Sequence, residues 1–120
     1  PRVALAADSN CPENVLNKAA GLFQSFDKHV SLIKDIPGMV LTRTVAMLVN
    51  EASMLVEEEV ADAADINMAM KKGVNYPLGS LEWGELWGYN AAVETLENLF
   101  CKYGERYRVS SWLQKKEKLG

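Results

Sequence analysis

Few side chains in this 120-residue sequence have the types and spacing that catalysis requires. His29 is the single histidine, and no nearby motif supplies the carboxylate that would orient it as a general base. Cys101 lies three residues before Gly104, at the expected end of a helix, where the helix dipole disfavours a nucleophilic thiolate. We therefore interpret both residues as structural and expect no catalytic residue in the chain.

The carboxylates and cysteines also lack the arrangement of a metal site. Glu57, Glu58 and Glu59 follow one another directly, so on a helix they point in three directions and are expected to face water. Cys11 and Cys101 are too few for a disulfide framework and have no metal-type spacing. We expect both thiols to be reduced and no metal to be bound.

Arg43 and Asn50 are the polar residues whose position is most informative. They lie seven residues apart in an otherwise apolar stretch, so on a helix they share one face, two turns apart. Polar groups on a mostly apolar helix must be hydrogen-bonded. Two interpretations remain open: a structural pair that holds a connector at residues 76–80, or the remnant of a substrate site.

The helix that carries this pair is expected at residues 39–59, and the rest of the chain is organised around it. Pro37 suits the start of a helix, because its fixed φ and missing N–H cost nothing there. Apolar residues at alternating spacings of four and three predict the buried seam: Leu41, Val45, Leu48, Ala52 and Leu55. Further apolar residues flank this seam, so we expect the helix to be buried.

Two more helices are predicted directly after it. Asp62 is a good N-cap for the first of them, which Gly73 ends. Tyr76 precedes Pro77, which favours an extended backbone and a fixed connector. The second helix is expected to be capped by Ser80 and stopped by Gly88, with its large apolar residues on one face: Trp83, Leu86 and Trp87.

The last part of the chain predicts one long helix and a short final turn. Asn90 is the expected cap of a helix at residues 91–103, which Gly104 stops. Its predicted apolar face consists of Val93, Leu96, Leu99, Phe100 and Tyr103. Ser110 or Ser111 starts the final turn, in which Trp112 is expected to dock the tail onto the body.

The N-terminal part has the length of a βαβ unit. Short strands are predicted at residues 3–7 and 29–33, with a helix between them that starts at Pro12, and two such strands lie parallel. Where the first strand turns into the helix the sequence reads AADSNCPEN, without the glycines that let a backbone approach a pyrophosphate. We expect this chain to bind no NAD.

Composition predicts a soluble globular domain, with 48% hydrophobic and 24% charged residues. A net charge of −3 gives no electrostatic reason to expect nucleic acid. No apolar run approaches the roughly 20 residues of a membrane span, and no signal peptide is visible. We therefore expect a cytoplasmic protein that binds neither nucleic acid nor a membrane. The first residue is Pro1, not Met, so we expect a piece of something longer.

Several motifs together resemble the C-terminal domain of NAD-dependent 3-hydroxyacyl-CoA dehydrogenases. They are PG with three apolar residues, Thr42 and Arg43, then LVNEA, VADAADINMAMKKGVNYPLG and LEWGELWG. The final RYR and SSWL resemble the end of the second of two tandem C-terminal repeats in longer bacterial enzymes of this family, which act on 3-hydroxybutyryl-CoA or 3-hydroxyadipyl-CoA. The resemblance implies fatty-acid β-oxidation or related acyl-CoA metabolism.

The resemblance also implies where substrate would be contacted. The family brings an asparagine into the active site at the position that Thr42 occupies here, and a hydroxyl cannot make all the hydrogen bonds of an amide. The family's GP pair is Gly79 followed by Ser80 in this chain. The substrate-side candidates are therefore Thr42, Arg43, Asn50, Tyr76, Pro77 and Gly79. Both departures favour a structural repeat over a copy that contacts substrate, and we expect the hydroxyl of Thr42 to bond back to a backbone carbonyl.

We therefore predict a mainly α protein of the α+β class that forms one compact unit. Residues 1–35 are a βαβ remnant resembling the end of a nucleotide-binding domain, and residues 36–120 are the helical domain. By resemblance, the chain is the substrate-side and dimerisation domain of an enzyme that oxidises 3-hydroxyacyl-CoA with NAD, and it is inactive alone. Its expected partners are the nucleotide-binding domain of the same enzyme and a second copy, with acyl-CoA bound only by the whole enzyme. The alternative is a free-standing helical interaction module without catalysis.

Overall fold

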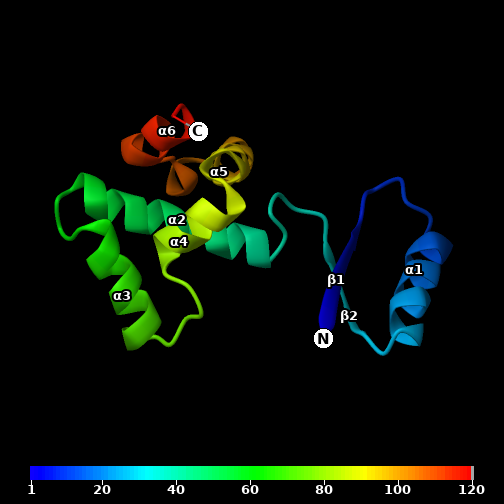
Figure 1. Cartoon of the computed structure of the whole chain (residues 1–120). Helices are drawn as coiled ribbons and strands as arrows, with labels where there is room; N and C mark the ends of the chain where they lie inside the picture. The colour runs from blue at the N-terminus through cyan, green and yellow to red at the C-terminus, as the bar shows by residue number, and fades with distance from the viewer. Residues whose placement is uncertain (120) are drawn as a thin grey trace. The chain divides into compact units, whose positions relative to one another are not determined.

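The structure, a computed structural model, describes residues 1–119 and divides into two compact units, Pro1–Met39 and Val40–Gly120 (Figure 1). The structure thus differs from the expected single compact unit, and the division follows Met39 instead of residue 35. The physical reason is that each unit makes most of its contacts within itself. The predicted fold class is confirmed, since helices predominate and the sheet has two strands.

The N-terminal unit is the predicted βαβ unit. It consists of β1 (Arg2–Ala7), α1 (Glu13–Ser25) and β2 (His29–Lys34). The two strands pair in parallel, in a register that runs from Arg2 opposite His29 to Ala7 opposite Lys34. Pro12 has an extended backbone and is the N-cap of α1, so the helix begins at Glu13, one residue later than predicted. No residue of α1 is buried, so this unit has little core of its own.

The C-terminal unit is helical. Its elements are α2 (Leu41–Glu57), α3 (Ala63–Gly73), α4 (Ser80–Trp87), α5 (Tyr89–Tyr103), the 3₁₀ turn η1 (Glu105–Tyr107) and α6 (Ser111–Glu117). α2 is the central helix as expected, since α3, α4, α5 and α6 all pack against it. It is shorter than predicted at both ends, because Met39 and Glu59 have positive φ angles of 46° and 56°.

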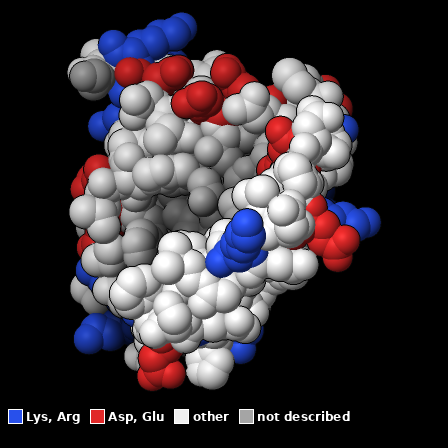
Figure 2. Space-filling view, turned by 90° about the vertical axis from the view of Figure 1, so that its right-hand side faces the viewer, with Lys and Arg blue, Asp and Glu red and all other residues white. Residues whose placement is uncertain are grey.

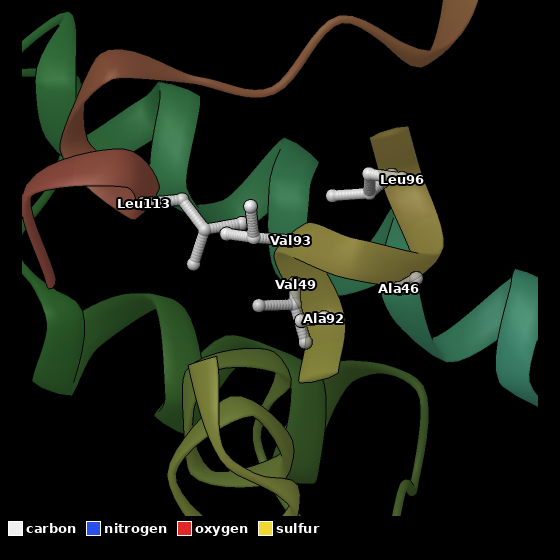
Figure 3. Close-up of a cluster of buried hydrophobic side chains, with 6 residues drawn as sticks. All are labelled: Ala46, Val49, Ala92, Val93, Leu96 and Leu113. Atoms are coloured by element: carbon white, nitrogen blue, oxygen red, sulfur yellow. The ribbon is translucent and has the colours of Figure 1, made fainter. Parts of the chain in front are cut away.

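The main core lies where α2, α5 and α6 meet (Figure 3). The close-up shows the six buried side chains of this cluster: Ala46, Val49, Ala92, Val93, Leu96 and Leu113. A second, smaller cluster joins α2, α3 and α4 through Ala52, Ile66 and Leu81. Trp112 packs against both clusters and meets the ring of Tyr89 edge to face, with centroids 5.7 Å apart. The prediction that Trp112 docks the tail is confirmed.

The predicted seam of α2 was wrong by about one residue, except at Ala52, which is buried as predicted. The fully buried positions are Ala46, Val49, Asn50 and Ser53, together with Ala52. Leu41 is 75% exposed, and Val45, Leu48 and Leu55 are only partly buried. A shift of one residue turns the buried face by about 100° around the helix axis. Small residues face the neighbouring helices because α5 and α4 approach α2 closely, and the larger residues are left on the flank.

Gly84 shows how close this approach is. A Cβ atom at Gly84 would lie 2.9 Å from Cγ1 of Val49 and 2.7 Å from the ring of Tyr89. Both distances are too short for real side chains, so a glycine is required where α4 crosses α2. The hydrophobic pattern alone could not reveal this constraint, because it depends on residues far apart in the sequence.

Most predicted helix ends are confirmed. The carboxylate of Asp62 accepts a hydrogen bond from the Asp65 N–H at 2.9 Å, and Ser110 caps α6 in the same way through the Leu113 N–H at 3.1 Å. Two caps were wrong, since Gly79 and not Ser80 is the N-cap of α4, and Gly88 and not Asn90 is the N-cap of α5. Both glycines adopt the non-helical backbone of a cap without a side-chain oxygen.

Figure 2 shows charged side chains of both signs, most of them along the edges of the face in view. This agrees with the small net charge of −3. Within residues 1–119, no helix combines the length and hydropathy needed to cross a membrane.

Candidate functional site

The residues with catalytic or metal-binding side chains stay apart in the structure. Within the described chain, no three His, Cys, Asp or Glu side chains gather as metal ligands would. His29 is exposed at the start of β2, and Cys101 is exposed on α5. Glu57, Glu58 and Glu59 are exposed, as predicted. The candidates for a functional site are therefore the polar contacts and the surface grooves of the C-terminal unit.

Arg43 is held between two aromatic rings. Its guanidinium carbon lies 4.9 Å from the ring centroid of Tyr103 and 5.0 Å from that of Tyr107. One guanidinium nitrogen, Nη2, also donates a hydrogen bond to the hydroxyl of Tyr107, which is only 2% exposed. Cation–π contacts of this kind are favourable, and more so where water is excluded. They fix Arg43 against the segment that follows α5.

Asn50 is the centre of a buried hydrogen-bond network between α2 and the start of α6. Its amide donates to the carbonyl of Arg108 at 2.9 Å and accepts from the N–H of Ser110 at 3.0 Å. Next to it the hydroxyls of Ser53 and Ser110 lie 2.6 Å apart. Every buried side-chain polar atom of the described residues has a partner. The network therefore carries no penalty for unsatisfied groups.

These contacts correct the proposed role of the pair. Arg43 and Asn50 share one side of α2, as predicted, but they hold residues 103–110 and not the connector at residues 76–80. Sequence spacing could place them on one face but could not identify the segment opposite. Tyr107 and Ser110 were missed as partners, because nothing local in the sequence marks a tyrosine hydroxyl or a backbone N–H as the partner of a distant side chain. The hydroxyl pair of Ser53 and Ser110 was missed for the same reason.

The connector is held by α3 and α4 instead. The side-chain oxygen of Asn67 accepts the N–H of Leu81 at 3.0 Å, and the Glu82 carboxylate accepts the N–H of Gly79 at 2.8 Å. Glu82 also forms an ion pair with Lys71. Gly79 is required here, because a Cβ at this position would collide with the side chain of Asn67.

The six substrate-side candidates do not form one site. Tyr76 and Pro77 are exposed in the connector, whereas Gly79 is buried at the start of α4. Arg43 and Asn50 are used by the contacts to residues 103–110. Thr42 lies in a different place, on an apolar groove between α2 and α4.

This groove has a volume of about 240 Å³. Its lining is formed by Leu41, Thr42, Val45, Trp83, Leu86 and Trp87. Leu86 is 72% exposed, and the predicted shared face of Trp83, Leu86 and Trp87 is confirmed. The expected bond from Thr42 back to a carbonyl is not among the hydrogen bonds of the described residues; Thr44 makes that bond instead, to Val40 at 2.8 Å. The geometry suits an apolar partner and gives Thr42 no catalytic neighbour.

Two carboxylates serve as helix caps. Glu57, at the end of α2, caps α6 by accepting hydrogen bonds from the N–H groups of Ser111 and Trp112. Hydrogen bonds from the side chain of Ser111 and the backbone of Trp112 lower the pKa of Glu57. The hydrogen bond from Lys71 and the N–H of Gly79 lower the pKa of Glu82 in the same way. Burial, with the nearby charge of Glu85, raises the pKa of Tyr89 to about 12. The position of Glu57 at the end of a helix suggested only a solvated side chain, so this cap was missed.

Comparison with known proteins finds two adjoining family matches. Residues 38–120 match the family described as the 3-hydroxyacyl-CoA dehydrogenase C-terminal domain. Residues 1–37 match the family described as the 3-hydroxybutyryl-CoA dehydrogenase reduced Rossmann-fold domain. The division between them falls two residues before the division between the two units of the structure.

Individual relatives agree with these matches. The chain is 44% identical to 3-hydroxyadipyl-CoA dehydrogenase of Escherichia coli over 115 residues, which are 95% of this chain and 24% of the relative. A crystal structure of 3-hydroxybutyryl-CoA dehydrogenase from E. coli is similar with a TM-score of 0.89 at 43% identity, over 98% of this chain and 25% of that one. FadB2 of Mycobacterium tuberculosis has the same fold, with a TM-score of 0.91 at 21% identity over 100% of this chain and 43% of that one. The chain thus spans about a quarter of the curated relative it matches over 115 residues.

Proposed function

Because the chain belongs to the family of 3-hydroxyacyl-CoA dehydrogenase C-terminal domains, as its motifs indicated, we propose that it serves as the substrate-side and dimerisation domain of such an enzyme. The whole enzyme would oxidise a 3-hydroxyacyl-CoA to the 3-oxoacyl-CoA with NAD. The observation that carries this proposal is the 44% identity to 3-hydroxyadipyl-CoA dehydrogenase over 95% of the chain.

The residues of this chain do not fit NAD, and we propose that another part of the whole enzyme binds it. The turn from β1 to α1 contains Asp8, whose carboxylate accepts the N–H of Asn10, and Pro12, which has no N–H to offer. A pyrophosphate needs free N–H groups and close approach at this turn. A carboxylate in the turn repels it as well.

In such an enzyme, the C-terminal unit would contribute a rigid helical scaffold and a surface for contact with other parts of the protein. Its buried polar network fixes α2 against α6, and the groove of Leu41, Thr42, Val45, Trp83, Leu86 and Trp87 leaves an apolar surface open. Exposed apolar surfaces of this kind mark interfaces. We propose that this groove contributes to a two-fold contact with a second copy.

A domain exchange tests the main proposal. In the E. coli 3-hydroxyadipyl-CoA dehydrogenase, the matching segment is replaced by this chain, and NADH formation from a 3-hydroxyacyl-CoA is measured. We expect the exchanged enzyme to keep kcat/KM within about tenfold and the enzyme lacking the segment to be inactive. A folded but inactive exchanged enzyme would favour the interaction module without catalysis. Ala46→Asp in the exchanged segment is the control that destroys its core.

Light scattering coupled to gel filtration tests the contact between copies. The chain is expected to elute as a dimer at tens of micromolar, and Leu86→Glu in the groove should shift it to a monomer. Met68→Glu, a matched exposed position on α3, should leave the dimer intact. A monomer mass for the unmodified chain contradicts the proposed contact.

A further inference from the structure

A second groove lies between α2 and the segment after α5. It has a volume of about 390 Å³, which is within the size of small-molecule sites. Met47 and Leu48 supply an apolar wall, and Arg43, Arg106 and Tyr107 line the groove together with Glu51. It shares none of its lining residues with the Trp83–Trp87 groove.

Two guanidinium groups gather here around one aromatic ring. The guanidinium carbons of Arg43 and Arg106 lie 5.0 Å and 5.9 Å from the ring centroid of Tyr107. Neither arginine forms an ion pair within the described residues, where the only ion pair is Lys71 with Glu82. Among the described residues, the guanidinium of Arg43 donates one hydrogen bond, to the Tyr107 hydroxyl, out of the five that it can donate.

The position of Glu51 limits which ligand fits. Glu51 is eight residues after Arg43 on α2, which places it about 12 Å further along the helix axis. The positive end of the groove is thus separated from its negative end by the apolar wall. A ligand that suits both ends carries an anionic group at one end, a flat apolar body, and a hydrogen-bond donor at the other.

We propose that this groove binds a phosphate monoester on a flat body with an amino group at its far end, as in a nucleoside monophosphate. The dianionic phosphate balances the two arginines, whose planar donors match phosphate oxygens. The base lies against Met47 and Leu48, and its amino group donates to Glu51. The proposal does not depend on the dehydrogenase assignment, since it is argued only from the lining, the charges and the contacts of the groove itself.

The test is titration of the full chain with adenosine 5′-monophosphate, followed by amide NMR shifts at low and at high salt. We expect saturable shifts confined to the groove residues on α2 and η1, and weaker binding at high salt because exposed charges are screened. Arg106→Gln should weaken binding about tenfold, since it removes one charge-assisted contact to the phosphate. Arg108→Gln is the matched control, an exposed arginine two residues away that does not line the groove.

The remaining outcomes also decide the proposal. Adenosine binding as tightly as its monophosphate, equal losses in Arg106→Gln and Arg108→Gln, or no saturation at millimolar concentration would each overturn it. Coenzyme A also carries a phosphate monoester beside an adenine, so it is added as a competitor. Competition at the same residues supports the site and identifies a coenzyme A nucleotide as its source, whereas absence of competition with intact monophosphate binding supports a free nucleotide.

Discussion

Helices in both units of this chain carry an apolar face, but the two units differ in what they bury. In the C-terminal unit, Leu96 and Leu99 of α5 and Leu113 of α6 are 0% exposed. In the N-terminal unit α1 has an equally clear apolar face, yet none of its residues is buried, and Leu22 and Phe26 are 58% and 66% exposed. An amphipathic pattern therefore reports which face a helix can bury and not whether a partner is present.

The difference follows from how many elements each unit contains. In the N-terminal unit, one helix packs against a parallel sheet of two strands. In the C-terminal unit, four helices pack around α2. A two-stranded sheet is marginally stable alone, and chains below about 40 residues usually need further support. The C-terminal unit should thus hold its fold by itself, and the N-terminal unit should not.

Cutting the chain between the units gives the largest expected effect. A peptide of residues 1–39 should be unfolded, while residues 40–120 should keep a cooperative thermal transition, because their core residues all lie within that unit. Circular dichroism against temperature measures both. A cooperative transition in the shorter peptide would show that the N-terminal unit is stable by itself, contrary to this prediction.

Truncating one leucine in each unit sharpens the comparison further. Leu96→Ala should lower the free energy of unfolding by about 2–5 kcal/mol, since it leaves a cavity in a fully buried position. Leu22→Ala in α1 should change it by no more than about 0.5 kcal/mol, because the side chain is 58% exposed. Chemical denaturation of both variants provides the values. Similar losses in both would mean that α1 is covered in solution.

The same contrast explains what the sequence could predict. Helix stops at Gly88 and Gly104 and the cap at Asp62 depend on residues within one turn, and all three are confirmed. The buried face of α2 depends on which helices cross it, and the large leucines favoured the wrong side. Small and polar residues such as Ala46 and Asn50 carry little weight in a hydrophobic pattern, although they are the buried ones.

The candidate site shows the same limit. The spacing of Arg43 and Asn50 was enough to place them on one side of a helix, and their need for partners followed from burial. The partners themselves lie 58 to 64 residues further along the chain, on Tyr107, Arg108 and Ser110. Only the tertiary fold brings that segment to α2, so no local pattern could have named it.

Asn50 offers a test of how much the polar contacts add to the C-terminal unit. Asn50→Ala leaves the carbonyl of Arg108 and the N–H of Ser110 without partners, so the free energy of unfolding should fall by about 1–3 kcal/mol. Asn98→Ala, on the exposed side of α5, is the control and should change it little. If both variants lowered the free energy of unfolding equally, the hydrogen bonds of Asn50 would not be what stabilises the C-terminal unit.

A smaller effect is expected at Glu57, the cap of α6. Its pKa is lowered in the folded state, so its contribution is present above the ordinary value of 4.5 and is lost as the pH falls through the folded pKa. Glu57→Gln should therefore lower the melting temperature slightly at neutral pH and match the unmodified chain in acid. Glu58→Gln, an exposed neighbour outside the cap, should show no such difference at any pH. If the difference in melting temperature between Glu57→Gln and the unmodified chain grew as the pH fell, Glu57 would not be the cap of α6.

The smallest effect is expected at Thr42, the position at which the family resemblance implies an asparagine. Thr42 lies on the apolar groove beside Leu41, Val45 and the tryptophans of α4, with no catalytic neighbour in the described unit. Thr42→Val replaces the hydroxyl by a methyl group of similar size on an apolar surface, so the free energy of unfolding should change by no more than about 1 kcal/mol. In the whole enzyme, kcat/KM for a 3-hydroxyacyl-CoA should stay within about twofold, because a lost catalytic hydrogen bond would cost about tenfold or more. Steady-state kinetics and melting of the same variant separate the two roles: a drop beyond tenfold with unchanged melting would make Thr42 a working substitute for the asparagine.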